Sequence, residues 1–221
     1  MSILAAAVPG APWTTLFLDV NTVARHTPWL RPVMTSYAAY GVVLFGGLLL
    51  AGWWIARRRP TTTAMVAALW APIGTLLAVA VNQPIVARVD EARPYTALPH
   101  ILVLANRSAD PSFPSDHATM AGAVTAGLFL VSWRLGAFTA IAAVLMAFAR
   151  VYIGAHYPQD VVAGLALGAL ITGIGYLLAR RPLTAVVRRL EQTPLRPLVT
   201  GPVHGDADRA SVIPADLPWR P

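Results

Sequence analysis

The stretch ARVYIGAHYPQD, residues 149–160, ends one apolar run and leads into the next, and it places Arg150, His156 and Asp160 at that junction. Charged groups beside membrane segments are costly and are usually retained for function. A helix that begins near Pro158 would set the carboxylate of Asp160 under the imidazole of His156, four residues earlier, where it can hold one ring nitrogen. A histidine oriented in this way beside a fixed positive charge is typical of a nucleophile that attacks a phosphate. The structural alternative is an interhelical ion pair between Arg150 and Asp160.

The composition around this stretch is that of a membrane protein. Of the 221 residues, 56% are hydrophobic and only 12% are charged, and the mean hydropathy is +0.58, which is too apolar for an ordinary soluble domain. All 17 basic residues are arginines, and the net charge is +7. Because these arginines flank apolar segments or lie in the C-terminal tail, membrane topology explains them better than nucleic-acid binding does. The chain has no cysteine, which excludes disulfides, thiolate metal sites and a cysteine nucleophile.

Five apolar runs are long enough to cross a bilayer. They predict an all-α, polytopic membrane helix bundle of about five transmembrane helices, with a core over residues 33–180. The runs cover residues 33–56, 61–85, 118–133, 135–152 and 161–179. Four glycines in the last run predict close contact with neighbouring helices: Gly164, Gly168, Gly173 and Gly175.

The two ends of the chain differ from this core. The N-terminal segment, residues 1–32, predicts an interfacial helix over residues 13–25 with Asn21 on its polar side. A sixth span over residues 3–20 is the alternative. Residues 181–221 are basic and proline-rich, and they predict a cytoplasmic tail.

The distribution of arginines predicts how the bundle is oriented. The groups at 57–59, 134 and 180–189 fall on one side of a five-span arrangement, whereas the polar loop over residues 86–117 and the turn over residues 153–160 fall on the other. The basic side is expected to be cytoplasmic. We therefore expect a multi-pass protein of the plasma membrane, with the loop and the turn together on the extracytoplasmic face.

Two further motifs reach the same face. The dipeptide RP occupies residues 93–94 within the loop, and PSDH occupies residues 114–117, where the loop becomes a helix. Alone, RP is more typical of an ordinary turn, and a simple helix cap is the structural alternative for PSDH. Ser115 is a favourable N-cap residue, and the N–H groups of a first helical turn bind anions. Two arginines, a helix N-terminus and two histidines around one point predict a pocket for a doubly charged phosphoryl group.

The order RP, PSDH and Arg-x5-His-x3-Asp resembles the type 2 phosphatidic acid phosphatase (PAP2) superfamily of membrane lipid phosphatases, which is related to the vanadium haloperoxidases. The resemblance covers residues 80–165 by motif. It implies that His156 attacks phosphorus and becomes phosphohistidine, that Asp160 orients it, and that His117 protonates the leaving oxygen and later helps to activate water. It implies no metal and no other cofactor. The groups that it assigns to the phosphoryl oxygens are Arg93, Arg150 and Ser115.

Two positions depart from the family pattern. Asp116 stands where the second motif usually has glycine, and its carboxylate is expected to raise the pKa of the neighbouring His117. Val86 stands where the first motif usually has a lysine, and Arg88 is the nearby cation that could replace it. Asp116 and Arg88 are therefore further candidates for the phosphate site. The alternative for Arg88 is a solvated pair with one of the acidic residues that follow it.

These features favour an integral membrane enzyme that removes a terminal phosphate from a lipid phosphate or diphosphate. An outward-facing site favours a polyprenyl diphosphate of the undecaprenyl-diphosphate type. Phosphatidic acid, phosphatidylglycerophosphate and a prenyl-phosphoryl sugar phosphate are alternative substrates. The expected partners are the lipid phosphate and membrane lipids, not nucleic acid. Hypotheses from other classes are a non-catalytic protein that binds or transports anionic lipids, and a vanadium-dependent peroxidase, which the apolar spans and the missing lysine disfavour.

Overall fold

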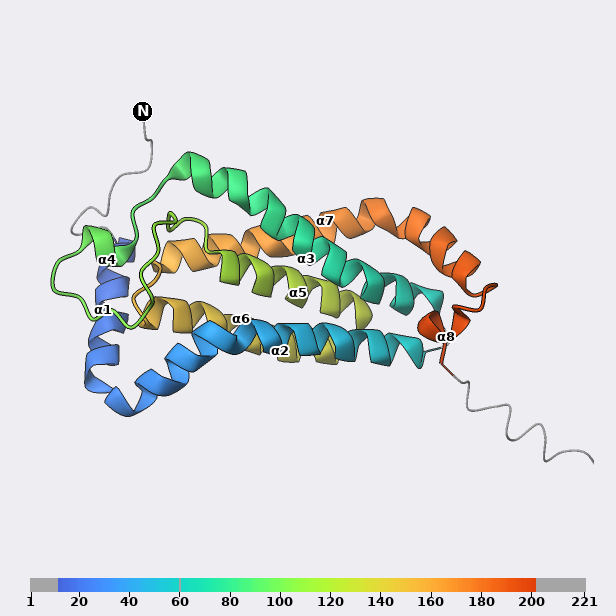
Figure 1. The fold of residues 1–221 in the computed structure, drawn as a ribbon, viewed down its shortest axis with the longest axis horizontal. Helices are drawn as coiled ribbons and strands as arrows, with labels where there is room; N and C mark the ends of the chain where they lie inside the picture. The colour runs from blue at the N-terminus through green and yellow to red at the C-terminus, as the bar shows by residue number, and fades with distance from the viewer. Residues whose placement is uncertain (1–11, 60, 202–221) are drawn as a thin grey trace, which may run out of the picture.

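The computed structural model describes residues 12–59 and 61–201, and every regular element in these ranges is helical. Five long helices run lengthwise through the molecule and form a bundle, with shorter helices at its two ends (Figure 1). This architecture confirms the predicted all-α bundle. The elements in chain order are α1 (Pro12–His26), η1 (Pro28–Leu30), α2 (Arg31–Arg57), α3 (Thr62–Val89), α4 (Pro94–Ala97), α5 (Asp116–Val131), α6 (Trp133–Tyr152), α7 (Pro158–Leu190) and α8 (Arg196–Val199).

Four segments within the described ranges are long and apolar enough to cross a membrane. Each contains one of the runs predicted from the sequence, apart from small differences at the ends. Their exposed surface is rich in leucine, valine and phenylalanine, which suits contact with lipid tails. The four segments are Pro28–Arg57, Thr62–Ala97, Trp133–Tyr152 and Pro158–Leu190.

The fifth predicted run corresponds to α5, which is shorter than the others. Its 16 residues give a length of roughly 24 Å at 1.5 Å per residue. It packs against α3, α6 and α7 and forms the buried centre of the bundle. The middle of α5 is shielded by these neighbours, whereas its first residue, Asp116, is exposed.

Glycines allow α5 and α7 to approach each other closely. A Cβ atom on Gly168 would lie 1.9 Å from the carbonyl oxygen of Thr119, and one on Gly164 would lie 2.7 Å from that of Ser115. Gly175 likewise faces the ring of Trp70 at 2.5 Å. Gly173 has no atom within 4 Å of such a Cβ, so the prediction of close contact is wrong at that position.

Helix α7 continues to Leu190, well beyond the predicted end of the last run at residue 179. The segment after residue 179 is rich in arginine, yet an apolar stripe persists through it. Val187 is fully buried, and Leu183 and Leu190 pack against the same core. This helical spacing keeps one side of α7 attached to the bundle.

Helix α1 lies across one end of the bundle (Figure 1). Asn21 was predicted on its polar side but is only 2% exposed. The side chain is buried because Nδ2 donates to the carbonyl oxygen of Leu102 (2.7 Å) while Oδ1 accepts from the N–H of Leu102 (3.0 Å). Residues 3–11, the first half of the alternative span over residues 3–20, lie outside the described residues, as does the tail beyond residue 201.

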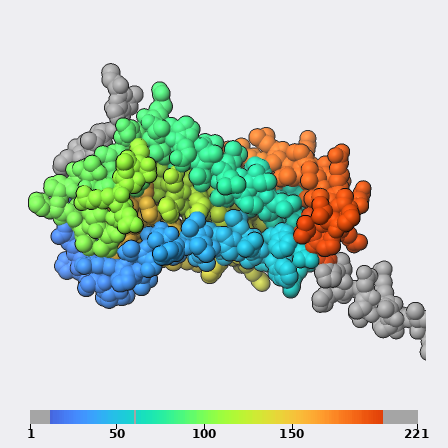
Figure 2. Space-filling view, viewed as in Figure 1, coloured from blue at the N-terminus to red at the C-terminus, as the bar shows by residue number. Residues whose placement is uncertain are grey.

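The molecule therefore has two dissimilar ends. Figure 2 shows α1 in blue and the polar loop between α3 and α5 in green covering one end, and the last turns of α7 with α8 in orange and red at the other. The loop is held to the turn between α6 and α7, because the N–H groups of Leu104 and Ala105 both donate to the carbonyl oxygen of Ile153, at 3.0 and 3.1 Å.

Candidate active site

The turn between α6 and α7 carries His156 in a fixed backbone conformation. Gly154 has a φ of 80°, in the left-handed region that favours glycine. The N–H of Ala155 donates to the carbonyl oxygen of Arg150 (3.1 Å), and Pro158 is the first residue of α7, as predicted. These constraints leave His156 only 2% exposed.

The two ring nitrogens of His156 have partners of opposite kind. Nδ1 lies 2.8 Å from the carbonyl oxygen of Ser112, which can only accept, so Nδ1 carries the proton. Nε2 lies 3.2 Å from Nη1 of Arg93 and 3.2 Å from Nη2 of Arg150, which can only donate. Nε2 therefore presents a lone pair. This is the neutral tautomer that a nucleophilic histidine requires.

The charge state of His156 agrees with this tautomer. Burial, followed by the positive charges of Arg150 and Arg93, holds the pKa of His156 well below its ordinary value. The ring is neutral at physiological pH, so the lone pair on Nε2 is available without prior deprotonation.

Asp160 contacts His156 less directly than the spacing predicted. Its Oδ2 lies 3.5 Å from Nδ1, which is long for a hydrogen bond. This oxygen instead accepts from the N–H of Tyr157 (2.8 Å) and from the hydroxyl of Ser112. Asp160 thus closes the first turn of α7 and reaches the histidine through Ser112.

Ser112 is a site residue that the sequence did not reveal. Its carbonyl oxygen fixes the imidazole of His156, its hydroxyl donates to Asp160, and its N–H donates to the carbonyl oxygen of Glu91 (2.7 Å). It lies 44 residues before His156 in the chain. Its position three residues before Ser115, in SFPSDH, was the only available signal.

The two predicted arginines are brought together as expected. Arg93 is braced by the carbonyl oxygens of Asp110 (2.7 Å, from Nε) and Ala155 (3.3 Å, from Nη1). Arg150, in the last turn of α6, has a buried Nε without a hydrogen-bond partner among the described residues. Both guanidinium groups converge on Nε2 of His156, where an incoming phosphoryl group would have to lie.

Ser115 occupies the N-cap position of α5, although its side chain makes no capping hydrogen bond. The hydroxyl is fully buried and has no partner among the described residues. Its backbone N–H donates to the carbonyl oxygen of Asp160 (3.1 Å), which joins the start of α5 to the start of α7. A buried, unpaired hydroxyl beside a helix N-terminus suits a phosphoryl oxygen.

His117 lies in the first turn of α5, before the apolar part of that helix. Burial, followed by the charges of Arg150 and His156, lowers its pKa to about 4. The charge of Asp116 raises the pKa of His117, as predicted, but burial and the neighbouring positive charges lower it by more. The predicted net rise in the pKa of His117 is therefore wrong. A bound phosphoryl dianion would favour the protonated form and restore the ability of His117 to act as an acid.

Asp116 faces α3. Its Oδ1 accepts hydrogen bonds from the amides of Asn82 (2.7 Å) and Gln83 (2.9 Å). An ionised carboxylate has no donor for phosphoryl oxygens. The structure therefore corrects the assignment of Asp116 to phosphate binding: the side chain links α5 to α3 beside the site.

Arg88 is not brought to the other site residues. It is exposed in the last turn of α3, and no hydrogen bond or ion pair joins it to any residue within 12–59 or 61–201. The predicted replacement of the lysine by Arg88 is therefore not supported, and neither is a pair with Asp90 or Glu91. Val86 is buried, so position 86 faces the interior of the bundle. Two positions later, Arg88 lies on a different face of the same helix.

Glu91 is a second residue that sequence reasoning missed. Its side chain is buried, and Oε1 accepts from Nε2 of Gln159 in the first turn of α7 (2.7 Å). Together with the backbone bond to Ser112, this contact ties the loop that carries Arg93 to the helix that follows His156. The motifs gave no signal for it.

The structure thus places a neutral, buried histidine between two arginines at one end of a bundle whose helices are long and apolar enough to cross a membrane. Residues 33–182 match the PAP2 superfamily, and the chain belongs to that superfamily. The predicted family is confirmed. The protein is accordingly a phosphoric ester hydrolase of the membrane lipid phosphatase class.

Individual relatives agree with this assignment. The chain is 28% identical to undecaprenyl-diphosphatase BcrC of Bacillus subtilis over 193 residues, which cover 85% of this chain and 95% of the relative. LpxE of Aquifex aeolicus superposes with a TM-score of 0.56 at 25% identity, over 77% of this chain and 98% of that one. A PAP2-type phosphatidylglycerolphosphate phosphatase of Bacillus subtilis superposes with a TM-score of 0.56 at 24% identity, over 76% and 86%, and shares the fold.

Proposed function

We propose that this protein hydrolyses the terminal phosphate of a polyprenyl diphosphate at the outer face of the plasma membrane, through a phosphohistidine at His156. The observation that carries the proposal is the pairing at His156: Nδ1 donates to Ser112, while Nε2 faces Arg93 and Arg150. This pairing supports a nucleophile whose lone pair points to where two cations would hold a phosphoryl group.

In the first step, Nε2 of His156 attacks phosphorus in line with the leaving oxygen. The N–P bond forms as the bond from phosphorus to the leaving oxygen breaks, and protonated His117 gives its proton to that oxygen. For a diphosphate substrate the leaving group is the lipid monophosphate. Arg93, Arg150 and the hydroxyl of Ser115 would hold the transferring oxygens, whose charge is spread in the transition state.

In the second step, water attacks the phosphohistidine. His117, now neutral, takes a proton from the water, and the N–P bond breaks. Inorganic phosphate leaves, and His156 returns to its neutral form. The low pKa of His117 favours this neutral state once the lipid product has left.

The substrate class is supported by the relative with the widest overlap among those compared above, which is named for undecaprenyl diphosphate. The outward orientation is supported by the arginines at the end opposite the site, in the turn after α2 and along the last turns of α7. A polyprenyl diphosphate with its headgroup in the outer leaflet would reach His156 from the lipid phase beside α1 and the loop.

A substrate panel tests the proposal. The protein in detergent is supplied with undecaprenyl diphosphate, phosphatidic acid, phosphatidylglycerophosphate and a prenyl-phosphoryl sugar phosphate, and phosphate release is measured in EDTA. We expect the highest kcat/KM for the diphosphate, activity that persists in EDTA, and loss of activity in His156→Ala. A clear preference for one of the other three lipids would reject the proposed substrate. Full activity in His156→Ala would reject the mechanism.

A further inference from the structure

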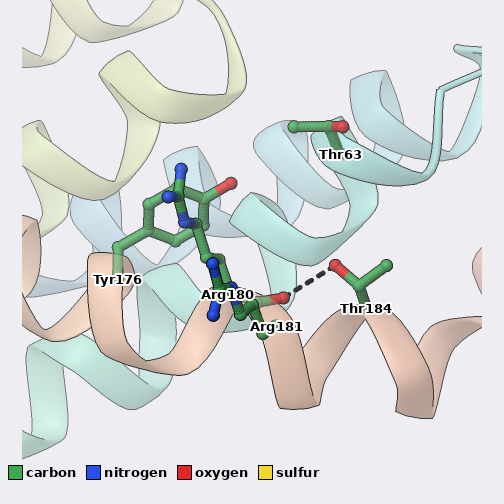
Figure 3. Close-up of a pocket in the computed structure, with 5 residues that line it drawn as sticks. All are labelled: Thr63, Tyr176, Arg180, Arg181 and Thr184. Carbon is green, nitrogen blue, oxygen red and sulfur yellow. Dashed lines mark hydrogen bonds between the residues drawn. The ribbon is translucent and has the colours of Figure 1, made fainter.

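A cavity lies at the end of the bundle opposite the candidate active site, between the start of α3 and the late turns of α7 (Figure 3). Its volume is about 390 Å³, which is within the range of ligand sites. From Pro158 to Arg180 along α7 the distance is roughly 33 Å at 1.5 Å per residue, so this cavity is separate from the catalytic site. It is lined by Thr63, Tyr176, Arg180, Arg181 and Thr184.

The two arginines of this cavity are exposed and have no partner among the described residues, a property that they share with Arg88. Neither guanidinium group of Arg180 or Arg181 makes a hydrogen bond, ion pair or ring contact with a residue that the structure describes. The arginines at the end of α2 are engaged by contrast: Arg57 and Arg58 lie over tryptophan rings, and Arg59 donates to the carbonyl oxygen of Val131 (2.9 Å). The cavity thus presents two free cations.

Hydroxyl groups complete the lining. Tyr176 and Thr63 add donors from α7 and α3, and Thr63 lies in the first turn of α3, where the helix dipole adds positive potential. The hydroxyl of Thr184 donates to the backbone oxygen of Arg180 (2.7 Å), the dashed line in Figure 3, and so stabilises the turn that carries both arginines. None of the described residues that line the cavity is acidic. This chemistry fits a phosphate-bearing anion.

The surface that leads away from the cavity is apolar. Leu177 and Leu178, one turn before Arg181 on α7, are 60% and 77% exposed. Ile174, one turn earlier in the helix, is also exposed. A ligand with a phosphate in the cavity and acyl chains along this face would contact both the arginines and the exposed apolar side chains. A soluble phosphate would contact only the arginines.

We propose that this cavity binds the headgroup of an anionic phospholipid from the leaflet at the basic end of the bundle. The phosphate lies between Arg180 and Arg181, and the acyl chains run along the exposed leucines of α7. Basic pockets between membrane helices on the cytoplasmic side bind anionic headgroups in this way. The bound lipid stabilises the contact between α3 and α7, and it is not a substrate of the distant His156.

A lipid titration of matched variants tests this site. Arg180→Gln/Arg181→Gln removes the two cavity cations, and Arg188→Gln/Arg189→Gln removes the same charge from exposed positions of α7 outside the cavity. The full-length protein in detergent is titrated with phosphatidylglycerol, phosphatidylcholine or inorganic phosphate, and Tm is followed by tryptophan fluorescence. Phosphate release from a lipid substrate, expected to be retained in both variants, shows that they are folded.

We expect phosphatidylglycerol to raise Tm of the wild type and of the Arg188/Arg189 variant, and to bind the Arg180/Arg181 variant about tenfold more weakly or worse. Phosphatidylcholine and inorganic phosphate are expected to give no comparable rise. Equal binding by the two double variants would overturn the site. An equal rise in Tm with phosphatidylcholine would show that the headgroup need not be anionic. An equal rise with inorganic phosphate would show that the ligand need not be a lipid.

Crosslinking gives a readout that does not depend on the stability of a variant. Phosphatidylglycerol with a photoactivatable group near its headgroup is irradiated with the wild-type protein, and the labelled peptides are mapped. Labels are expected within residues 174–184 of α7 and at the start of α3. Labels confined to other parts of the chain would contradict the proposal.

Discussion

Ser112 connects the two residues that the sequence motif pairs directly. The imidazole of His156 is held by the Ser112 carbonyl oxygen, and Asp160 is held by the Ser112 hydroxyl. The motif spacing predicted contact across one helical turn, but the first turn of α7 directs the carboxylate back to the N–H of Tyr157. Position in the chain could not reveal Ser112, because its contacts depend on how the loop folds over α7.

The first prediction concerns this serine. Ser112→Ala keeps the carbonyl oxygen that fixes His156 but removes the hydroxyl that donates to Asp160. Loss of one hydrogen bond to a charged group is expected to lower kcat about 10- to 100-fold, less than the loss in His156→Ala. Steady-state kinetics with a lipid phosphate measure the effect, and Ser108→Ala in the same loop is the control. An unchanged kcat in Ser112→Ala would show that Asp160 needs no such support.

The second prediction follows from the titration of His117. Its folded-state pKa of about 4 lies below the ordinary value of 6.5, so the folded state favours the neutral ring. The associated stability is present above pH 6.5 and is lost as the pH falls toward 4. Between pH 6.5 and pH 5 the loss from this residue is about 1–2 kcal/mol. Tm of the wild type should therefore fall over this interval, and Tm of His117→Gln should fall less. Parallel curves for the two proteins would contradict the shift.

Arg88 and Asp116 mark the limit of motif reasoning at the residue scale. Asp116 was assigned to the phosphate because of its place in a motif, and Arg88 because it is the cation near the position where the family has a lysine. On the helix, however, Arg88 points away from the side that buries Val86, and Asp116 turns to the amides of Asn82 and Gln83. Arg93 and Arg150, which the structure does bring together at His156, stand at the ends of helices.

At the scale of helices, the contact between α5 and α7 sets the geometry of the site, because Ser115 at the start of α5 bonds Asp160 in the first turn of α7. The apolar runs predicted which segments are helical. Their ends were less predictable: α5 is a buried 16-residue helix, and α7 continues because Val187 still packs into the core. Packing against neighbouring helices determines where α5 and α7 end, and the apolar run of one helix alone does not contain that information.

A glycine pair tests this contact. Gly168→Ala places a Cβ 1.9 Å from the backbone oxygen of Thr119, so α7 must shift, whereas Gly173→Ala meets no atom within 4 Å. Overpacking of this kind costs about 1–3 kcal/mol or more. We expect a clearly lower Tm and lower activity in Gly168→Ala, and wild-type values in Gly173→Ala. Similar Tm values for both variants would show that the close approach is unnecessary.

At the scale of the whole molecule, charge separates the two ends. The candidate active site lies at the end covered by α1 and the polar loop, and the helix ends that carry the arginines after α2 and along the last turns of α7 lie at the other (Figure 1). This arrangement was predictable from the sequence, since it needs only the order of apolar runs and arginines. The burial of Asn21 was not predictable, because it requires the loop residue Leu102 as its partner.

Orientation in the membrane can be tested because the chain lacks cysteine. Single cysteines are introduced at Asn106, exposed in the polar loop, and at Arg188, exposed near the end of α7. A membrane-impermeant maleimide is expected to label Asn106→Cys in intact cells, and Arg188→Cys only after permeabilisation. The opposite pattern would place the site on the cytoplasmic face and exclude the proposed outer-leaflet substrate.

The phosphoenzyme tests the central claim most directly. The protein is mixed with a lipid substrate that carries labelled terminal phosphate, quenched in alkali within milliseconds to seconds, and digested for mass spectrometry. The account predicts an alkali-stable, acid-labile phosphoryl group on His156, absent from His156→Ala and from protein mixed with unlabelled substrate. Turnover without any labelled protein, or a label on a residue other than His156, would contradict it.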